Sequence, residues 1–132
     1  MAIHVFVDKD GNSIYFEHLC SGTHFYELRL AISESLENGK KGSRFPVLQK
    51  TPDYEAYFSI EQTKALRKEI KTILQEKDKF IREYKNIPYL TLQGIVPKDF
   101  DMPLDFIVSR LEIILKGCKI AIESNGTLGW VY

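Results

Sequence analysis

The chain has 132 residues, of which 44% are hydrophobic, 12% aromatic and 27% charged, and its formal net charge is zero. This composition is typical of a globular protein with a sizeable core and excludes an intrinsically disordered chain. Zero net charge also provides no overall field that would favour nucleic acid or an anionic membrane. We therefore expect a single domain over residues 1–132.

The charges are unevenly distributed along the chain. Residues 1–38 carry a net charge of −4, and residues 39–50 carry a net charge of +4. Patches of opposite sign on a neutral protein favour a specific, complementary partner over a simple polyanion.

The sequence shows no targeting or membrane signal. No basic segment is followed by a long apolar run, so we expect neither a signal peptide nor a membrane span. Two cysteines, Cys20 and Cys118, are too few for a disulfide framework. These features predict a cytoplasmic protein with both thiols reduced.

Two strands joined by a tight turn are predicted at the N-terminus. Residues 3–7 and 13–16 are rich in β-branched and aromatic side chains, and Asp8-Lys9-Asp10-Gly11-Asn12 lies between them. An Asp-Gly pair suits a two-residue hairpin turn because glycine adopts positive φ at little steric cost. We expect an antiparallel hairpin here.

A helix is predicted over residues 23–38. Its apolar residues recur with the helical period, which indicates one buried face. Glu27, Glu34 and Glu37 fall outside this apolar stripe, so we expect all three to face water.

The segment after this helix is a short cationic loop. Asn38-Gly39 supplies the left-handed residues that end a helix, and Pro46 restricts the residue before it to an extended conformation. We therefore expect a strand over residues 47–49. The alternation of apolar and polar residues over 54–58 predicts another strand.

The second half of the chain predicts two long helices. Ser59 and Gln62 have the spacing of a capping box at the start of a helix over residues 60–85. Further along we expect a strand, a helix and a terminal strand, over residues 89–96, 103–123 and 127–132. The last helix is apolar on more than one side, which predicts a central position. The expected fold is α+β: a mainly antiparallel sheet of about five to six strands with three helices packed on it.

Three side chains that could ligate a metal or act in catalysis, His18, Cys20 and His24, lie within seven positions. A closed zinc site needs a fourth ligand, and only the helix start after Cys20 could lower its thiol pKa. We therefore expect no metal, no cofactor and no catalytic residue, and predict that the protein is not an enzyme. A small enzyme or ligand-binding domain with a cleft at these three residues is the alternative.

A second group combines basic and aromatic side chains: Lys40, Lys41, Arg44, Tyr54 and Tyr57. Such a group can bind nucleic acid, but zero net charge argues against it. Tyrosine and arginine also dominate many protein–protein interfaces, which favours a protein partner. A structural role for Arg44 stays open, because its side chain could fold back onto a carboxylate or a helix end.

The segment over residues 36–48, LENGKKGSRFPVL, is followed by a tyrosine-rich strand and the helix start Ser59-Ile60-Glu61. This combination resembles the immunity protein 70 family of bacterial polymorphic-toxin immunity proteins, which has a similar segment after its first helix. The residues that match it are Asn38, Gly39, Gly42, Ser43, Arg44, Phe45 and Pro46. The ending is similar too, in Cys118, Ala121 and residues 128–131, whereas the turn over residues 50–56 departs from the family pattern.

The resemblance implies a protein that binds and neutralises a cognate toxin by non-covalent protein–protein contact. It implies a protein toxin as partner, with neither nucleic acid nor membrane, and leaves a homodimer open. An acidic toxin would suit the lysines and Arg44, and a cationic toxin the glutamates. The expected toxin-binding residues are Lys40, Lys41, Arg44, Tyr54, Tyr57, Glu27, Glu34 and Glu37.

Overall fold

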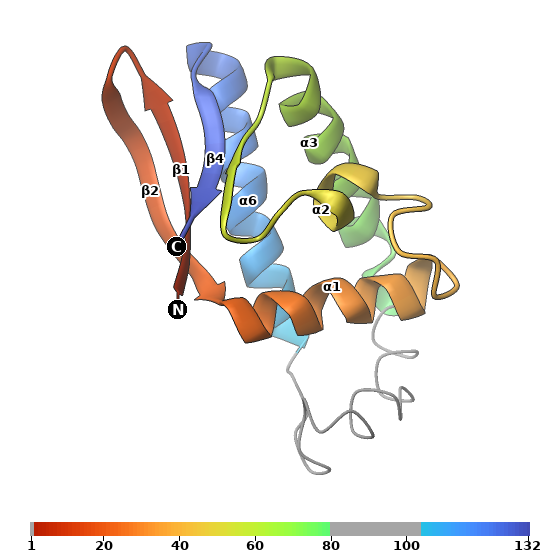
Figure 1. The fold of residues 1–132 in the computed structure, drawn as a ribbon. Coiled ribbons are helices and arrows are strands. Elements are labelled where there is room, and N and C mark those ends of the chain that lie inside the picture. The colour runs from red at the N-terminus through yellow and green to blue at the C-terminus, as the bar shows by residue number, and fades with distance from the viewer. Residues whose placement is uncertain (1, 80–103) are drawn as a thin grey trace.

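The structure is a computed structural model that describes residues 2–79 and 104–132. Its elements are β1 (Ala2–Lys9), β2 (Asn12–Ser21), α1 (Gly22–Leu36), α2 (Pro46–Lys50), β3 (Glu55–Tyr57), α3 (Ile60–Gln75), α6 (Leu104–Ser124) and β4 (Thr127–Val131). The strands form one antiparallel sheet with the order β2-β1-β4-β3 (Figure 1). The expected α+β class is confirmed, with four strands in the described ranges instead of five to six.

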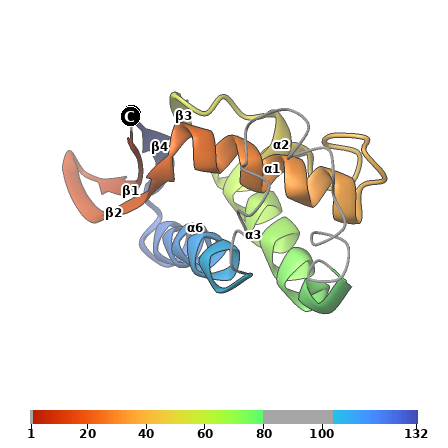
Figure 2. The same ribbon diagram turned by 90° about the horizontal axis from the view of Figure 1, so that it is seen from below.

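The helices are arranged around one face of the sheet. Helix α6 lies along this face and contacts β1, β2 and β4, while α3 packs against α6 and α2. Helix α1 continues from the end of β2 and crosses the end of the sheet (Figures 1 and 2). Helix α3 therefore reaches the rest of the fold mainly through other helices, which differs from the expected three helices packed on the sheet.

The predicted hairpin is confirmed, and its turn has the expected conformation. Asp10 and Gly11 have φ values of 51° and 81°, which are the positive values that a two-residue hairpin turn needs. The register pairs Phe6 with Phe16 across β1 and β2. On the other side of β1, Phe6 pairs with Gly129 of β4.

The predicted strand over residues 47–49 is wrong, because this segment belongs to helix α2. Proline at the first position of a helix has a suitable φ and lacks only an N–H that would be unpaired there, so Pro46 fits a helix start as well as a strand. The strands predicted over 54–58 and 127–132 correspond to β3 and β4. The strand predicted over 89–96 lies outside the described residues.

The predicted helix starts and stops are largely confirmed. Gln62 N–H donates to Ser59 Oγ at 3.1 Å and Ser59 N–H donates to Gln62 Oε1 at 2.9 Å, which completes the capping box of α3. Helix α3 ends at Gln75, before the predicted end. At the end of α6, Gly126 N–H donates to Ala121 O at 2.9 Å after Asn125 with φ of 56°.

Helix α6 occupies the central position that its apolar residues predict. A Cβ added at Gly117 would lie 2.9 Å from Leu128 Cδ1 and 3.2 Å from Val5 Cγ1, so the helix approaches β4 and β1 closely. Its buried residues are Ile107, Leu111, Ile114, Gly117, Cys118 and Ala121. In the described ranges, no helix combines the length and the apolar character needed to cross a membrane.

The mutation Leu111→Ala tests the central position of α6. Leu111 is 1% exposed, so its truncation should lower the free energy of unfolding by about 2–5 kcal/mol through lost burial and a residual cavity. Urea denaturation monitored by circular dichroism measures this change. Leu115→Ala, at a partly buried position of the same helix, is the control and should cost less. A near-zero loss at Leu111 would contradict the central position.

Candidate functional site

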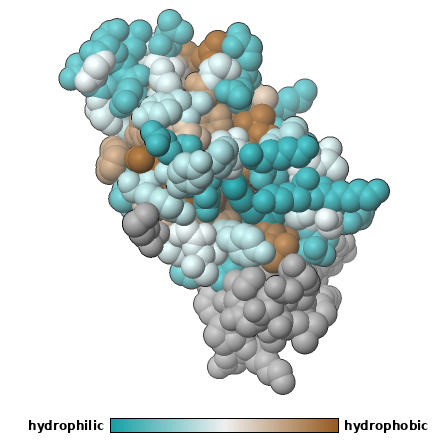
Figure 3. All heavy atoms as spheres, viewed as in Figure 1, coloured by the Kyte–Doolittle hydropathy of each residue, from teal (hydrophilic) through white to brown (hydrophobic). Residues whose placement is uncertain are grey.

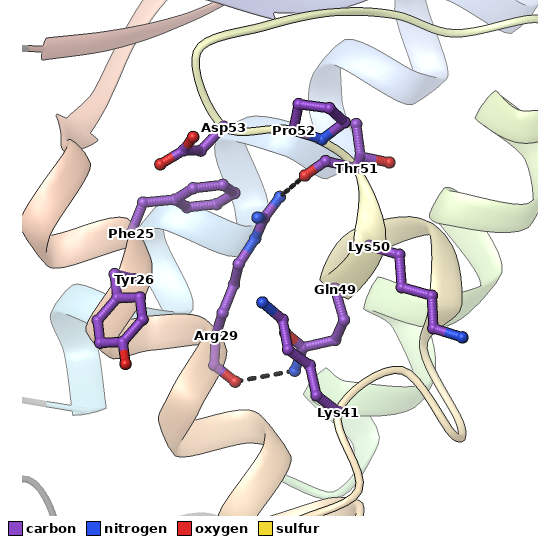
Figure 4. Close-up of a pocket in the computed structure, with 9 residues that line it drawn as sticks. All are labelled: Phe25, Tyr26, Arg29, Lys41, Gln49, Lys50, Thr51, Pro52 and Asp53. Carbon is purple, nitrogen blue, oxygen red and sulfur yellow. Dashed lines mark hydrogen bonds between the residues drawn. The ribbon is translucent and has the colours of Figure 1, made fainter.

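Two adjoining hollows lie on the face that carries α2 and β3. One has a volume of about 500 Å³ and the other about 430 Å³, and both are lined by Lys50, Thr51 and Pro52. We call the first the arginine pocket; its other lining residues are Phe25, Tyr26, Arg29, Lys41, Gln49 and Asp53 (Figure 4). The second also includes Pro46, Val47, Glu55, Tyr57 and Gln62 in its lining. Together the two hollows form what we call the α2–β3 surface. Figure 3 views the molecule from the side on which Figure 1 shows α2, with apolar residues visible among hydrophilic ones.

Helix α2 owes its start to a carboxylate from α3. The residue before the helix, Phe45, has no side-chain oxygen with which to cap it. Instead, Glu69 Oε2 accepts a hydrogen bond from Val47 N–H at 3.1 Å, and Oε1 accepts one from Leu48 N–H at 2.9 Å. These N–H groups at the start of a helix have no partner within it, and a negative charge is favourable there.

A second buried carboxylate, that of Glu37, connects the end of α1 to the start of α2. Its Oε2 accepts hydrogen bonds from Arg44 N–H at 3.0 Å and Phe45 N–H at 3.1 Å. Its Oε1 accepts one from Gln49 Nε2 at 2.9 Å. Glu37 is 2% exposed, so the expectation that it faces water is wrong.

Arg44 holds the same loop from its outer side. Its Nη1 donates to Leu36 O at 3.1 Å, at the end of α1, and its Nη2 forms an ion pair with Glu76 Oε2 at 2.7 Å. The guanidinium also lies over the Phe45 ring, 4.9 Å from its centroid. These contacts match the structural alternative for Arg44, although 41% of its side chain is exposed.

The segment between the two hollows is fixed through two consecutive carbonyl groups. Thr51 O accepts a hydrogen bond from Arg29 Nη2 at 2.7 Å, and Pro52 O accepts one from Trp130 Nε1 at 2.6 Å. Trp130 is fully buried and packs edge to face against Phe25 and Phe58. Helix α1, through Arg29, and strand β4, through Trp130, thus fix the position of this turn.

Most of the sequence-predicted toxin-binding residues lie at the surface. Tyr54 and Tyr57 are 59% and 62% exposed, and Lys41 lines the arginine pocket whereas Tyr57 lines the second hollow. The others that are exposed are Lys40, Arg44 and Glu34.

Glu27 and Glu37 are exceptions, because both are buried. Helix α1 is covered on most of its sides, so its buried set extends beyond the apolar stripe and includes Glu27 and Arg29. Burial raises the pKa of Glu27, against the opposing effect of His24. Neither glutamate faces water as the sequence predicted.

The residues of the alternative cleft lie in three different environments. A register shift in the hairpin places Leu19 and Cys20, two successive residues, in the core. Burial raises the pKa of the Cys20 thiol to about 12, which opposes formation of a nucleophilic thiolate. His18 contacts His4, with ring centroids 5.5 Å apart, and His24 contacts Phe106 at the same separation. Among the described residues, no three His, Cys, Asp or Glu side chains form a group that could hold a metal ion.

Two features of the structure were missed from the sequence. Ile14 and Phe16 are 45% and 58% exposed, and Phe16 stacks on His4 with ring centroids 4.9 Å apart. Their signal was the run of apolar residues over 14–16, which places apolar side chains on both faces of a strand. Arg29 was also missed, although it is a lone cation within the apolar residues 28–32.

Fold and site together define a small α+β protein with an accessible polar and aromatic surface beside a buried arginine. Comparison with protein families matches residues 4–86 to immunity protein 70. The chain belongs to this family, as the resemblance of its loop and helix start predicted. The family suggests a non-enzymatic role. The match covers all residues that line the two hollows. Comparisons with curated proteins and with solved structures give no match.

Gly42→Ala tests whether the loop before α2 depends on glycine. Gly42 has φ of 82°, and an added Cβ would lie 2.6 Å from Lys50 Cε. Left-handed backbone conformation costs an alanine about 1–2 kcal/mol, so Gly42→Ala should reduce the free energy of unfolding by at least this amount, measured by urea denaturation.

Gly11→Ala provides a matched control for this loop. Gly11 has nearly the same φ, 81°, but nothing lies within 4 Å of an added Cβ. If Gly42→Ala lowers the free energy of unfolding more than Gly11→Ala does, the difference measures the contact with Lys50. Adding Lys50→Ala to Gly42→Ala should remove this difference. Unchanged stability of Gly42→Ala would contradict the conformational requirement.

The carboxylate that caps α2 predicts a specific pH dependence. Burial raises the pKa of Glu69 above its usual 4.5, against the opposing effect of the Leu48 and Val47 N–H groups. The unfolded chain therefore loses this proton at lower pH than the folded protein. The resulting stability is fully present below about pH 4.5 and is lost as the pH rises through the folded-state pKa.

Glu69→Gln should remove this contribution. The free energy of unfolding of the wild type relative to Glu69→Gln should therefore fall as the pH rises from about 4 to 7, as measured by urea denaturation at a series of pH values. Glu61→Gln, an exposed position on the same helix, controls for the loss of one charge. A constant or rising difference would show that the hydrogen bonds outweigh burial at Glu69.

Proposed function

We propose that this protein is the immunity protein of a bacterial polymorphic toxin system. It binds a cognate protein toxin non-covalently and thereby neutralises it. Membership of the immunity protein 70 family is the observation that carries this proposal. The burial of Cys20, which raises the pKa of its thiol, favours binding over catalysis.

The α2–β3 surface is the part of the molecule that we assign to the toxin. It combines exposed tyrosines with hollows, and tyrosines that fill or flank pockets commonly contribute much of the affinity at protein interfaces. Tyr57 and Lys41 line the two hollows, and Tyr54 lies in the turn between them. The glutamates Glu27 and Glu37 contribute no accessible charge, because they are buried.

The rigidity of this surface supports the same assignment. Its central turn is held by Arg29 and Trp130, and its helix is held by Glu37 and Glu69. A surface that is already ordered loses little conformational entropy on binding, which favours high affinity. We also place the protein in the cytoplasm, where its two free, buried thiols would stay reduced.

Isothermal titration calorimetry with a toxin domain that co-purifies with this protein as bait tests the proposal. The wild-type protein should bind with a 1:1 stoichiometry, and its co-expression should restore growth of cells that produce the toxin. The double variant Lys41→Ala/Tyr57→Ala should lose affinity by at least about tenfold if both residues contact the toxin. Absence of binding by the wild-type protein would refute the proposed function.

A matched pair of substitutions elsewhere on the molecule is the control for this surface. Lys119→Ala/Phe16→Ala removes one exposed lysine from α6 and one exposed aromatic side chain from β2. This control should keep the wild-type affinity. A larger loss in the control would place the toxin at β2 or α6 and contradict the assignment to α2 and β3.

A further inference from the structure

The arginine pocket contains a cation that is buried without a matching anion. Arg29 is 7% exposed, and its guanidinium lies over the Phe25 ring, 4.2 Å from the centroid. Its Nη2 donates to Thr51 O, whereas its Nε is buried without a hydrogen-bond partner. Within the described part of the chain, no carboxylate lies within ion-pairing distance of this guanidinium.

The protein compensates this charge only in part. Burial lowers the pKa of Arg29 to about 10, even though Asp53 and Tyr132 oppose the shift. Of these two groups Asp53 lines the pocket, and its carboxylate accepts a hydrogen bond from the Tyr132 hydroxyl at 3.3 Å. A buried cation without a paired anion is unfavourable in a folded protein. Such an arrangement is therefore expected where a ligand supplies the anion.

The other charged residues of the pocket add to the positive charge. Its lining includes three cations, Arg29, Lys41 and Lys50, and a single carboxylate, that of Asp53. Figure 4 shows the Lys41 side chain extending towards Gln49 and the stem of Arg29. A carboxylate entering this pocket would thus meet a net positive charge before it reached the guanidinium.

The walls of the pocket favour a side chain over a free inorganic anion. Phe25, Tyr26 and Pro52 present apolar surface beside the arginine, which would pack against the methylene groups of an aspartate or glutamate. The pocket also shares the turn of Lys50, Thr51 and Pro52 with the hollow that contains Tyr57. A protein bound across α2 and β3 would therefore cover both.

We propose that the arginine pocket receives the carboxylate of one aspartate or glutamate side chain of the toxin, which pairs with Arg29. This proposal rests on the proposed function and specifies the chemistry of the partner. In the complex, the planar guanidinium would donate to the carboxylate through the N–H groups that Thr51 O leaves free and that face the pocket, which suits arginine better than lysine.

Calorimetric titration of the toxin domain into wild type, Arg29→Met and Arg29→Lys tests the proposal. We expect Arg29→Met to lose affinity about 10- to 100-fold, because it leaves the toxin carboxylate buried and unpaired. The affinity of Arg29→Lys for the toxin should lie between those of the wild type and Arg29→Met, because lysine retains the charge but lacks the planar guanidinium. The melting temperature of each free variant is measured alongside, because Arg29→Met also loses the hydrogen bond to Thr51 O that holds the turn, and only a variant that stays folded reports on the contact with the toxin. Wild-type affinity in Arg29→Met would overturn the inference while leaving the proposed function intact, and absence of binding by the wild type would refute the proposed function itself.

A double-mutant cycle identifies the partner residue. Each acidic residue of the toxin is replaced by its amide and titrated against wild type and Arg29→Met. One replacement should weaken binding to the wild type at least about tenfold and have little further effect on Arg29→Met. If Arg29→Met cannot be folded, the same cycle with Arg29→Lys should show a smaller coupling. No coupled acidic residue would overturn the proposal.

Inorganic phosphate distinguishes a toxin side chain from a free anion. Phosphate should compete with the toxin at the wild-type protein more strongly than at Arg29→Met. If phosphate instead raised the melting temperature of the wild type without altering toxin affinity, the pocket would be a free-anion site and the assignment to the toxin would be overturned.

Discussion

The buried carboxylate of Glu37 is the interaction on which the candidate site depends. It accepts hydrogen bonds from Arg44 N–H, Phe45 N–H and the Gln49 side chain, so one side chain joins the end of α1 to both ends of α2. A five-residue helix is not stable by itself, because the few hydrogen bonds within it do not offset the unfavourable free energy of helix nucleation. Glu37 from one side and Glu69 from α3 supply what the local sequence lacks. The position of α2, and with it that of Lys50 and the following turn, is therefore determined by tertiary contacts.

This dependence explains where sequence reasoning succeeded. The Asp10-Gly11 turn and the Ser59–Gln62 capping box are each determined by residues within a few positions of one another, and each has the predicted form. Helix α2 is different, because its capping carboxylate lies more than twenty positions later in the chain. Pro46 was compatible with both a strand and a helix, and only the contact with α3 decides between them.

The site residues divide in the same way. The predicted residues Lys41, in the loop before α2, and Tyr57, on the short strand β3, have polar or amphipathic side chains, and each lines a hollow. In the sequence, Glu27 and Glu37 look like exposed glutamates. Their burial depends on how many other elements pack around α1, and the apolar periodicity of a single helix does not give this number. Arg29 was overlooked for the converse reason. A cation among apolar residues indicates either a long side chain that reaches water or a buried charge, and only the packing of Phe25 and Thr51 around it shows which.

The burial of acidic groups also changes the meaning of the charge distribution. The first 38 residues have an excess of acidic side chains. The carboxylate of Glu37, however, is buried and accepts hydrogen bonds from backbone and side-chain N–H groups. The cations that follow, Lys40, Lys41 and Lys50, stay exposed. The exposed charged side chains over residues 39–50 are therefore all cationic. The C-terminal strand completes this surface, because Trp130 fixes the Pro52 carbonyl although it lies beyond the residues that match the family. A segment outside the family match thus contributes to the geometry of a surface formed entirely within it.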